Sequence, residues 1–195
     1  ERIEQIAKND IHEPVDLRHM VRRVLYENER AADAKRIRIS SNLPDEALIL
    51  LADPAQLHEA VFNLVENAIK YTPEEGTVAV SLAQEDDEAV FTVQDSGYGI
   101  PTEQQEKLFS PGFRAESDET KNIHGTGWGL YLVKGIVERH GGDMIFHSVY
   151  RKGSTFGFRL PPEPRPKRRK STQNVRRDGG GVSHNNDGAI SLFDM

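Results

Sequence analysis

Apolar side chains recur at helical spacing in three stretches of the chain, residues 16–34, 54–71 and 127–140. Apolar positions three and four residues apart lie on one face of a helix, so each stretch predicts a helix with one buried side. An aspartate stands at the start of the first stretch and just before the second, which is typical of an N-cap. Gly141 and Gly142 predict the end of the third helix.

Between the helices, apolar and polar residues alternate with the period of two that indicates β-strands. The pattern predicts a short strand near Val15, a hairpin from residues 37–40 and 47–50, and two further hairpins. The strands of those two hairpins are expected at residues 77–82 and 89–94, and at residues 143–149 and 154–160. These elements favour an α+β fold, a two-layer sandwich with helices on one face of a mixed, mostly antiparallel sheet.

The two ends of the chain differ from this central part. Residues 161–195 begin with a proline-rich stretch and contain seven basic and four acidic residues, so we expect a disordered basic tail. Residues 1–13 have the apolar spacing expected for the end of a helix that began upstream, followed by a linker. The sequence therefore predicts one folded domain at residues 14–160 between two extensions.

Composition narrows the classes of function. The net charge of -6 divides into +3 for residues 161–195 and -9 for residues 1–160, and so acidic a body is unsuited to general nucleic-acid binding. The chain has no cysteine, which excludes a disulfide scaffold, a thiolate metal site and a cysteine nucleophile. We expect a cytoplasmic location, whether or not the full-length protein is anchored in a membrane, because no apolar run approaches the roughly 20 residues of a membrane-spanning helix.

The predicted helix at residues 54–71 has an unusual polar face. A turn of about 100° per residue brings Asn63, Glu66, Asn67 and Lys70 together, opposite the apolar stripe. Asparagine is a weak helix former, so two asparagines on one face indicate a ligand. Their amide oxygens suit a Mg²⁺ ion that carries phosphate oxygens, and Lys70 suits a phosphate. Taken alone, an ordinary solvent-exposed face explains the pattern equally well.

A glycine-rich turn follows the strand that ends at Asp95. Gly97 and Gly99 lack a Cβ atom, which lets the backbone approach a flat ligand closely. The Asp95 carboxylate would accept a hydrogen bond from an exocyclic amine and repel a carbonyl, so it would favour adenine over guanine. For this segment alone, a simple Asp-Ser-Gly turn is the more economical interpretation.

A second glycine loop precedes the third predicted helix, with glycines at positions 125, 127 and 129. Free N–H groups at a helix start bind anions, and glycines let phosphates come near. The loop has neither the Walker spacing nor the dinucleotide fingerprint. Its specificity comes from following the other two segments in this order.

Together the segments resemble the catalytic ATP-binding domain of sensor histidine kinases, in the superfamily that includes DNA gyrase, MutL-type repair proteins and Hsp90-type chaperones. Residues 63–72 resemble the N box of the family, residues 95–100 its G1 box, residues 109–114 its F box and residues 125–130 its G2 box. The resemblance spans residues 14–160 and implies the Bergerat-type ATP-binding fold. Trp128 departs from a common leucine, and Gly112 widens the F box by one residue.

The resemblance implies a role for each matching position. Asn67, helped by Asn63, would hold Mg²⁺, and Lys70 and Tyr71 would face the phosphates of ATP. Residues 96–124 would form a mobile lid whose Arg114 contacts phosphate. The adenine would lie at Asp95, Gly97, Gly99 and Ile100, and the phosphates would lie at Gly125, Thr126, Gly127, Trp128, Gly129 and Leu130.

Position 63 bears on the reaction that this resemblance implies. Hydrolysing members of the superfamily carry a glutamate four residues before the Mg²⁺-binding asparagine, where it activates water. Here that position is Asn63, which cannot take a proton near neutral pH. Glu66 is a nearby carboxylate, but its direction differs by about 60° around the helix. We therefore expect phosphoryl transfer to a histidine, with Asn63, Glu66, Asn67, Lys70 and Arg114 as the catalytic set.

The resemblance also implies partners. The acceptor histidine is expected on an upstream dimerisation domain, not at His12, and a response regulator would take the phosphoryl group. The full-length protein would be a homodimer and this chain alone a monomer. Three alternatives stay open: a catalytically weak ATP-binding module, an anti-sigma-type serine kinase with the same ATP site, and an interaction protein that uses the basic run at residues 167–170.

Overall fold

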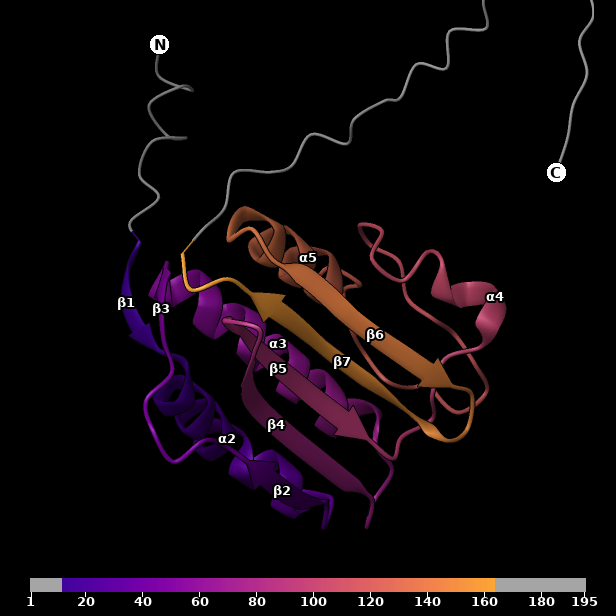
Figure 1. Ribbon diagram of the computed structural model, residues 1–195. Helices are drawn as coiled ribbons and strands as arrows, with labels where there is room; N and C mark the ends of the chain where they lie inside the picture. The colour runs from indigo at the N-terminus through magenta and orange to yellow at the C-terminus, as the bar shows by residue number, and fades with distance from the viewer. Residues whose placement is uncertain (1–11, 164–195) are drawn as a thin grey trace, which may run out of the picture.

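The computed structural model describes residues 12–163. The helix end expected before residue 12 and most of the expected basic tail lie outside the described residues. Figure 1 shows long helices packed against strands that run across the molecule. In chain order, the elements are β1 (Glu13–Asp16), α2 (Leu17–Ala34), β2 (Arg38–Asn42), β3 (Ile49–Ala52), α3 (Pro54–Tyr71), β4 (Thr77–Glu85), β5 (Glu88–Asp95), the single turn α4 (Thr102–Gln105), α5 (Gly129–Arg139), β6 (Asp143–Val149) and β7 (Gly153–Leu160).

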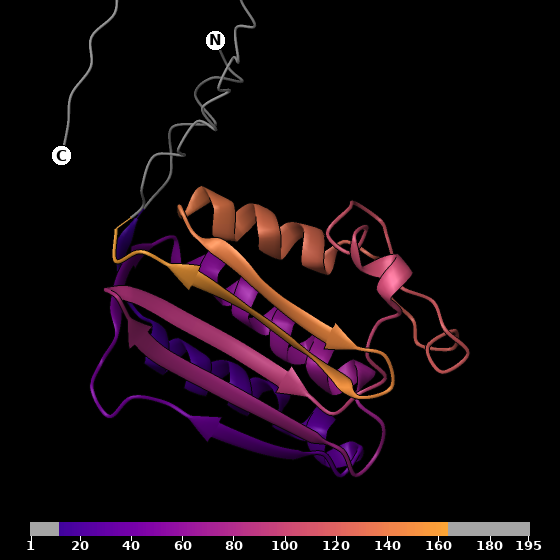
Figure 2. The same cartoon turned by 45° about the vertical axis from the view of Figure 1, so that its right-hand side comes forward.

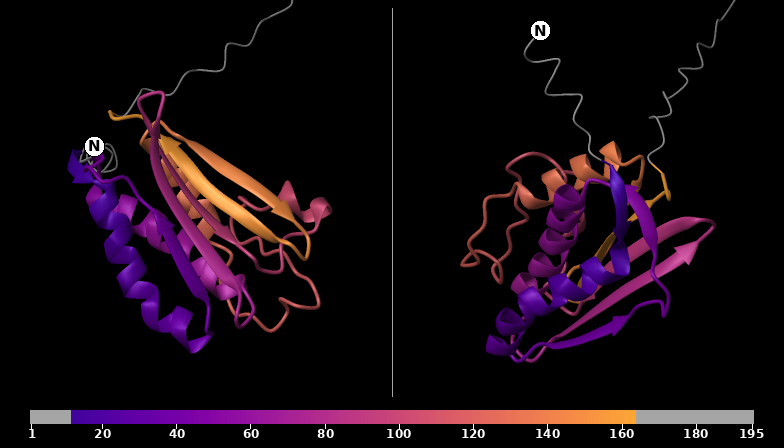
Figure 3. Two further views of the ribbon diagram at one scale, coloured as in Figure 1. Left: turned by 60° about the horizontal axis from the view of Figure 1, so that its bottom comes forward. Right: turned by 90° about the vertical axis from the view of Figure 1, so that its left-hand side faces the viewer.

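The main sheet has five strands in the order β2-β4-β5-β7-β6. Strand β2 pairs with β4 in parallel, and the other three pairings are antiparallel. Helices α2, α3 and α5 cover one face of this sheet, so that sheet and helices form two layers (Figures 2 and 3). The expected α+β sandwich with a mixed, mostly antiparallel sheet is confirmed.

The inner face of the sheet explains how an acidic side chain comes to face the helices. Along β5, Phe91 and Val93 point into the core, and Phe91 lies opposite Phe158 of β7 with ring centroids 5.1 Å apart. Side chains two residues apart share a face of a strand. Asp95 therefore continues the buried row and lies on the helix side of the sheet, opposite Ser154 in the register of β5 and β7.

The hairpin expected from residues 37–40 and 47–50 is wrong. The first strand, β2, pairs in parallel with β4, where Ile39 lies opposite Val78. The second, β3, pairs antiparallel with β1, where Leu50 lies opposite Val15. The loop between β2 and β3 passes the start of α2, where the Leu17 amide donates to the Leu48 carbonyl over 2.9 Å. Both strands thus pair with segments far away in the chain, which alternation alone does not specify.

Both predicted helix caps are present. Asp16 accepts from the amides of Arg18 and His19 at the start of α2. Asp53 accepts from the amides of Ala55 and Gln56 at the start of α3, in both cases over 3.0 Å. These bonds satisfy N–H groups that a helix start otherwise leaves without partners. The Asp53 cap fixes the residue at which α3 begins and therefore which of its residues face the sheet.

Replacing Asp53 with alanine is expected to lower the free energy of unfolding by about 1 kcal/mol, the usual cost of a lost N-cap. Urea unfolding followed by circular dichroism measures the change. Glu59→Ala is the control, because the Glu59 side chain is exposed on the same helix. Equal stability of the two variants would contradict a capping role for Asp53.

Candidate active site

A cavity lies between the polar face of α3, the start of α5 and the segment that joins β5 to α5. The ends of β5 and β7 close it on the side of the sheet. All but two of the site residues expected from the sequence line this cavity. They are Asn63, Glu66, Asn67, Lys70, Tyr71, Asp95, Gly99, Ile100, Arg114, Gly125, Thr126, Gly127, Gly129 and Leu130.

The two asparagines of α3 face the start of α5. The Asn63 side-chain amide donates to the Glu59 carbonyl over 2.8 Å, which directs its Oδ1 atom the other way. A Cβ atom at Gly129, the first residue of α5, would lie 2.9 Å from this Oδ1 and 3.7 Å from Asn67 Nδ2. Because no side chain among residues 12–163 caps α5, its first N–H groups remain open to an anion. The structure thus brings together amide oxygens and an anion-binding helix start.

Lys70 reaches across the cavity toward the glycine loop. Its ammonium lies 5.5 Å from the centroid of the Tyr71 ring. A Cβ atom at Gly125 would lie 2.8 Å from Lys70 Nζ and 3.7 Å from the Tyr71 hydroxyl. The loop comes this close only because position 125 has no side chain. The same Cβ atom would lie 3.8 Å from Arg114 Nε, so a phosphate at this point would meet two cations and one hydroxyl donor.

Asp95 is buried at the sheet end of the cavity, with 7% of its surface exposed. Its Oδ1 atom accepts from the amides of Gly97, over 2.8 Å, and Ser154, over 3.2 Å. Within residues 12–163, no hydrogen bond reaches its Oδ2 atom. Burial raises the pKa of Asp95 from 3.8 to about 6, although both amide hydrogen bonds act in the opposite direction. The site therefore holds one carboxylate oxygen fixed and leaves the other for a ligand.

Two expected residues do not line the cavity. Gly97 lies beneath the end of α3, where a Cβ atom would come within 2.4 Å of the Tyr71 carbonyl oxygen. Trp128 is 52% exposed and packs edge-on against Tyr131, with ring centroids 5.8 Å apart. Gly97 therefore supports the site from behind, and Trp128 presents an apolar surface beside the cavity.

Arg114 lines the cavity from the segment between β5 and α5. One guanidinium nitrogen, Nη2, donates to the Ile123 carbonyl, while the buried Nε has no partner within residues 12–163. A buried donor without a partner costs free energy, so this nitrogen favours an added acceptor. The extra Gly112 adopts a φ of 71° and lies against Gly127, which joins the F box to the glycine loop.

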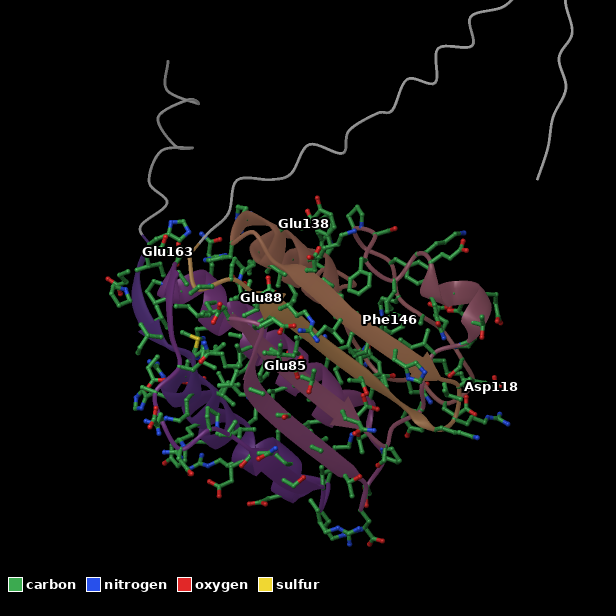
Figure 4. All side chains as sticks on the ribbon, viewed as in Figure 1. Glu85, Glu88, Asp118, Glu138, Phe146 and Glu163 are labelled. Carbon is green, nitrogen blue, oxygen red and sulfur yellow. The ribbon has the colours of Figure 1, made fainter. Side chains whose placement is uncertain are left out.

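The same segment is held to the sheet at two points. Glu119 accepts from the Tyr150 hydroxyl over 3.0 Å and pairs with the Arg151 guanidinium over 2.8 Å. Phe109 packs edge-on against Phe146 of β6, with ring centroids 5.9 Å apart. Figure 4 places Asp118 at the outer end of this segment and Glu163 at the opposite end of the molecule. The expected lid is therefore anchored to β6 and to the turn that follows it.

Several lining residues were absent from the sequence-based set. Ser154 and Phe156 enter because β7 pairs with β5, a contact across 59 residues that no local pattern reveals. The remaining ones come from α3 and from the joining segment, whose irregular backbone has no periodicity to read. They are Ala68, Tyr98, Leu108, Phe113, Ala115 and Thr120.

The donor set fits Mg²⁺ bound together with phosphate. Within residues 12–163, no three histidine or acidic side chains form a cluster that could hold a metal ion. Mg²⁺ usually keeps several waters and takes few protein ligands besides substrate phosphates. Asn63 Oδ1 and the Asn67 amide, beside the open start of α5, match that chemistry.

Comparison with known proteins gives the family. Residues 52–164 match the model of the histidine kinase-, DNA gyrase B- and HSP90-like ATPases. The chain belongs to this family, whose ATPase domain implies ATP binding. It is also 38% identical to the sensor histidine kinase WalK of Bacillus subtilis over 122 residues, which cover 62% of the chain and 20% of WalK.

Solved structures give the same result. The mycobacterial sensor histidine kinase MprB superposes with a TM-score of 0.67 at 30% identity, covering 80% of this chain and all of that one. The histidine kinase ThkA, in complex with the response regulator protein TrrA, superposes with a TM-score of 0.66 at 26% identity, covering 84% of this chain and 48% of ThkA. The relatives similar to this chain are therefore sensor histidine kinases.

The chain spans only 17% to 34% of the length of the first curated relatives that it matches. Across residues 12–163, none of the helices combines the length and hydropathy needed to span a bilayer.

Proposed function

We propose that this chain is the catalytic domain of a sensor histidine kinase, which binds Mg-ATP in the cavity and transfers the γ-phosphoryl group to a histidine. The observation that carries the proposal is the convergence of the α3 amides, the open start of α5 and the buried Asp95 on one cavity. Similarity to sensor histidine kinases supports the choice of a histidine as acceptor.

The side chains of the cavity divide the work of holding the nucleotide. The Asp95 Oδ2 atom would accept from the exocyclic amine of adenine. The N–H groups at the start of α5, Lys70 and Arg114 would hold the phosphates. Asn63 and Asn67 would hold Mg²⁺, which would neutralise negative charge on the phosphates. Catalysis would then come mainly from positioning and electrostatic stabilisation.

The acceptor would lie outside the described residues, on an upstream dimerisation domain. His12 is not suited to this role, because it lies at the wrong end of α5. Its ring centroid is 5.3 Å from that of His140, the C-cap of α5, whereas Gly129 at the other end of this helix faces the cavity. We infer that a response regulator then takes the phosphoryl group, as the complex of ThkA with TrrA suggests for that relative. The full-length protein would act as a homodimer, with this domain in the cytoplasm whether or not the protein is anchored in a membrane.

Analysis of the products of ATP tests the proposal. The protein with its dimerisation domain is expected to form acid-labile, alkali-stable phosphohistidine from labelled ATP. The chain of residues 1–195 alone is expected to bind ATP and release phosphate slowly. Fast phosphate release by the chain, without phosphohistidine in the longer protein, would instead identify a hydrolase.

Asn63→Glu is expected to raise phosphate release by roughly tenfold or more, because a positioned general base contributes about 10²- to 10⁴-fold. The glutamate would occupy the position from which it can take a proton from water. Asn63→Gln is the matched control, since it changes the length of the side chain and adds no base. Equal release by the two variants would show that position 63 does not divide the reaction between water and histidine.

A further inference from the structure

The last turn of α3 is held by a side chain from another helix. Lys35, the residue that ends α2, directs its half-buried ammonium at the C-terminal carbonyls of α3. Its Nζ donates to the carbonyl of Ile69 over 2.8 Å and to that of Lys70 over 3.0 Å. It also donates to the carbonyl of Thr72. One ammonium, with three hydrogens, thus serves three carbonyl oxygens.

The neighbouring carbonyls of this helix end have other donors. The Thr72 hydroxyl donates to the Ala68 carbonyl over 2.6 Å, and the Tyr98 amide donates to the Tyr71 carbonyl over 3.2 Å. A helix end leaves its last four carbonyls without helical partners. Lys35 is therefore the donor for two of these four, at positions 69 and 70, and the last turn depends on it.

The turn after α2 is itself fixed to the loop that follows α3. The Glu75 amide donates to the Lys35 carbonyl over 2.9 Å. The Arg36 guanidinium pairs with Glu74 over 2.8 Å and with Glu75 over 3.2 Å. Lys35 therefore reaches α3 from a backbone that is tied to the same loop, and its ammonium has little freedom to move away.

We propose that Lys35 is a positioning residue of the nucleotide site: its ammonium fixes the last turn of α3 and thereby the direction of Lys70 and Tyr71 in the cavity. This inference rests on the proposed nucleotide site. Lys35 does not line the cavity, so it acts only through the helix. Its positive charge also interacts favourably with the negative end of the helix dipole, which a neutral donor would not do.

The test measures the affinity of the 195-residue chain for a fluorescent ATP analogue with Mg²⁺. Lys35→Cys is expected to weaken binding roughly tenfold, because small displacements of positioning groups are costly. The chain has no other cysteine, so 2-bromoethylamine rebuilds an ammonium of lysine length at this position alone. Rebuilding the ammonium is expected to restore the affinity, and alkylation with iodoacetamide, which adds a neutral amide, is expected to leave it weak.

Asp16→Ala is the control for a general loss of stability, because it removes the cap at the other end of α2, away from the cavity. It is expected to lower the melting temperature and leave nucleotide affinity unchanged. Lys35→Gln is measured as well, so that a folding defect of the cysteine variant cannot decide the result. Wild-type affinity in a folded Lys35 variant, or equal affinity after both alkylations, would overturn the inference. Absence of binding by the wild-type chain would instead contradict the proposed function.

Discussion

Asn67→Ala is expected to lower phosphoryl transfer by roughly two to three orders of magnitude, the usual effect of removing one group that stabilises charge in a transition state. The Asn67 side chain lies on the cavity face of α3 beside the start of α5, where the proposed Mg²⁺ and phosphates would meet. Without its amide, the metal would lose its main protein ligand. The dependence of nucleotide affinity on Mg²⁺ is expected to fall as well. Calorimetric titration with a non-hydrolysable ATP analogue, with and without Mg²⁺, measures this dependence.

Asn28→Ala is the matched control for Asn67→Ala. Asn28 is a buried asparagine of α2 whose side chain donates to the Val24 carbonyl over 2.9 Å, remote from the cavity. Its loss is expected to lower stability and leave the dependence of nucleotide affinity on Mg²⁺ unchanged. If Asn67→Ala kept the Mg²⁺ dependence of the wild type, the proposed metal site would be wrong.

Asp95→Asn is expected to weaken ATP binding by about 10- to 100-fold, because a hydrogen bond to a charged group contributes about 1.5–3 kcal/mol. An asparagine side chain can also donate to a carbonyl, so the preference for ATP over GTP is expected to fall. Competition of ATP and GTP for a fluorescent analogue measures both effects. An unchanged preference would remove Asp95 from adenine recognition.

The pKa of Asp95 gives this variant a second signature. Because burial raises the pKa to about 6 in the folded state, the folded chain binds a proton there that the unfolded chain, with a pKa near 3.8, releases. Stability from this group is thus present below about pH 4 and lost as pH rises through about 6, a change of about 3 kcal/mol. Urea unfolding of wild type between pH 4 and 7 is expected to show this loss, and Asp95→Asn to lack it. The affinity of the wild type for ATP is expected to fall below about pH 6, as the acceptor takes a proton.

Local chemistry explains which elements the sequence predicts well. Helix α3 starts after Asp53, whose side chain caps it, and its apolar residues repeat over five turns, so both its start and its faces follow from nearby residues. Hairpin β6–β7 closes through Gly153, which adopts a φ of 108°. Each of these features depends on residues that lie only a few positions apart in the sequence.

Long-range pairing explains what the sequence does not predict. The pairings of β2 with β4 and of β3 with β1 join segments about 40 residues apart, and the expected hairpin between β2 and β3 does not form. The site shows the same division. The sequence predicts Asp95, Gly125 and Asn67 as site residues, because each lies in a short motif. Ser154, which donates to Asp95, and Lys35, which holds α3, are single residues whose neighbours only the fold reveals.

The central claim is that the cavity delivers the γ-phosphoryl group of ATP to a histidine and not to water. A time course with γ-labelled ATP and the protein that includes its dimerisation domain tests it directly, with protein-bound phosphohistidine and free phosphate counted in the same samples. The proposed function predicts that label appears first on histidine and that free phosphate accumulates slowly. Rapid release of free phosphate with no labelled histidine would contradict it.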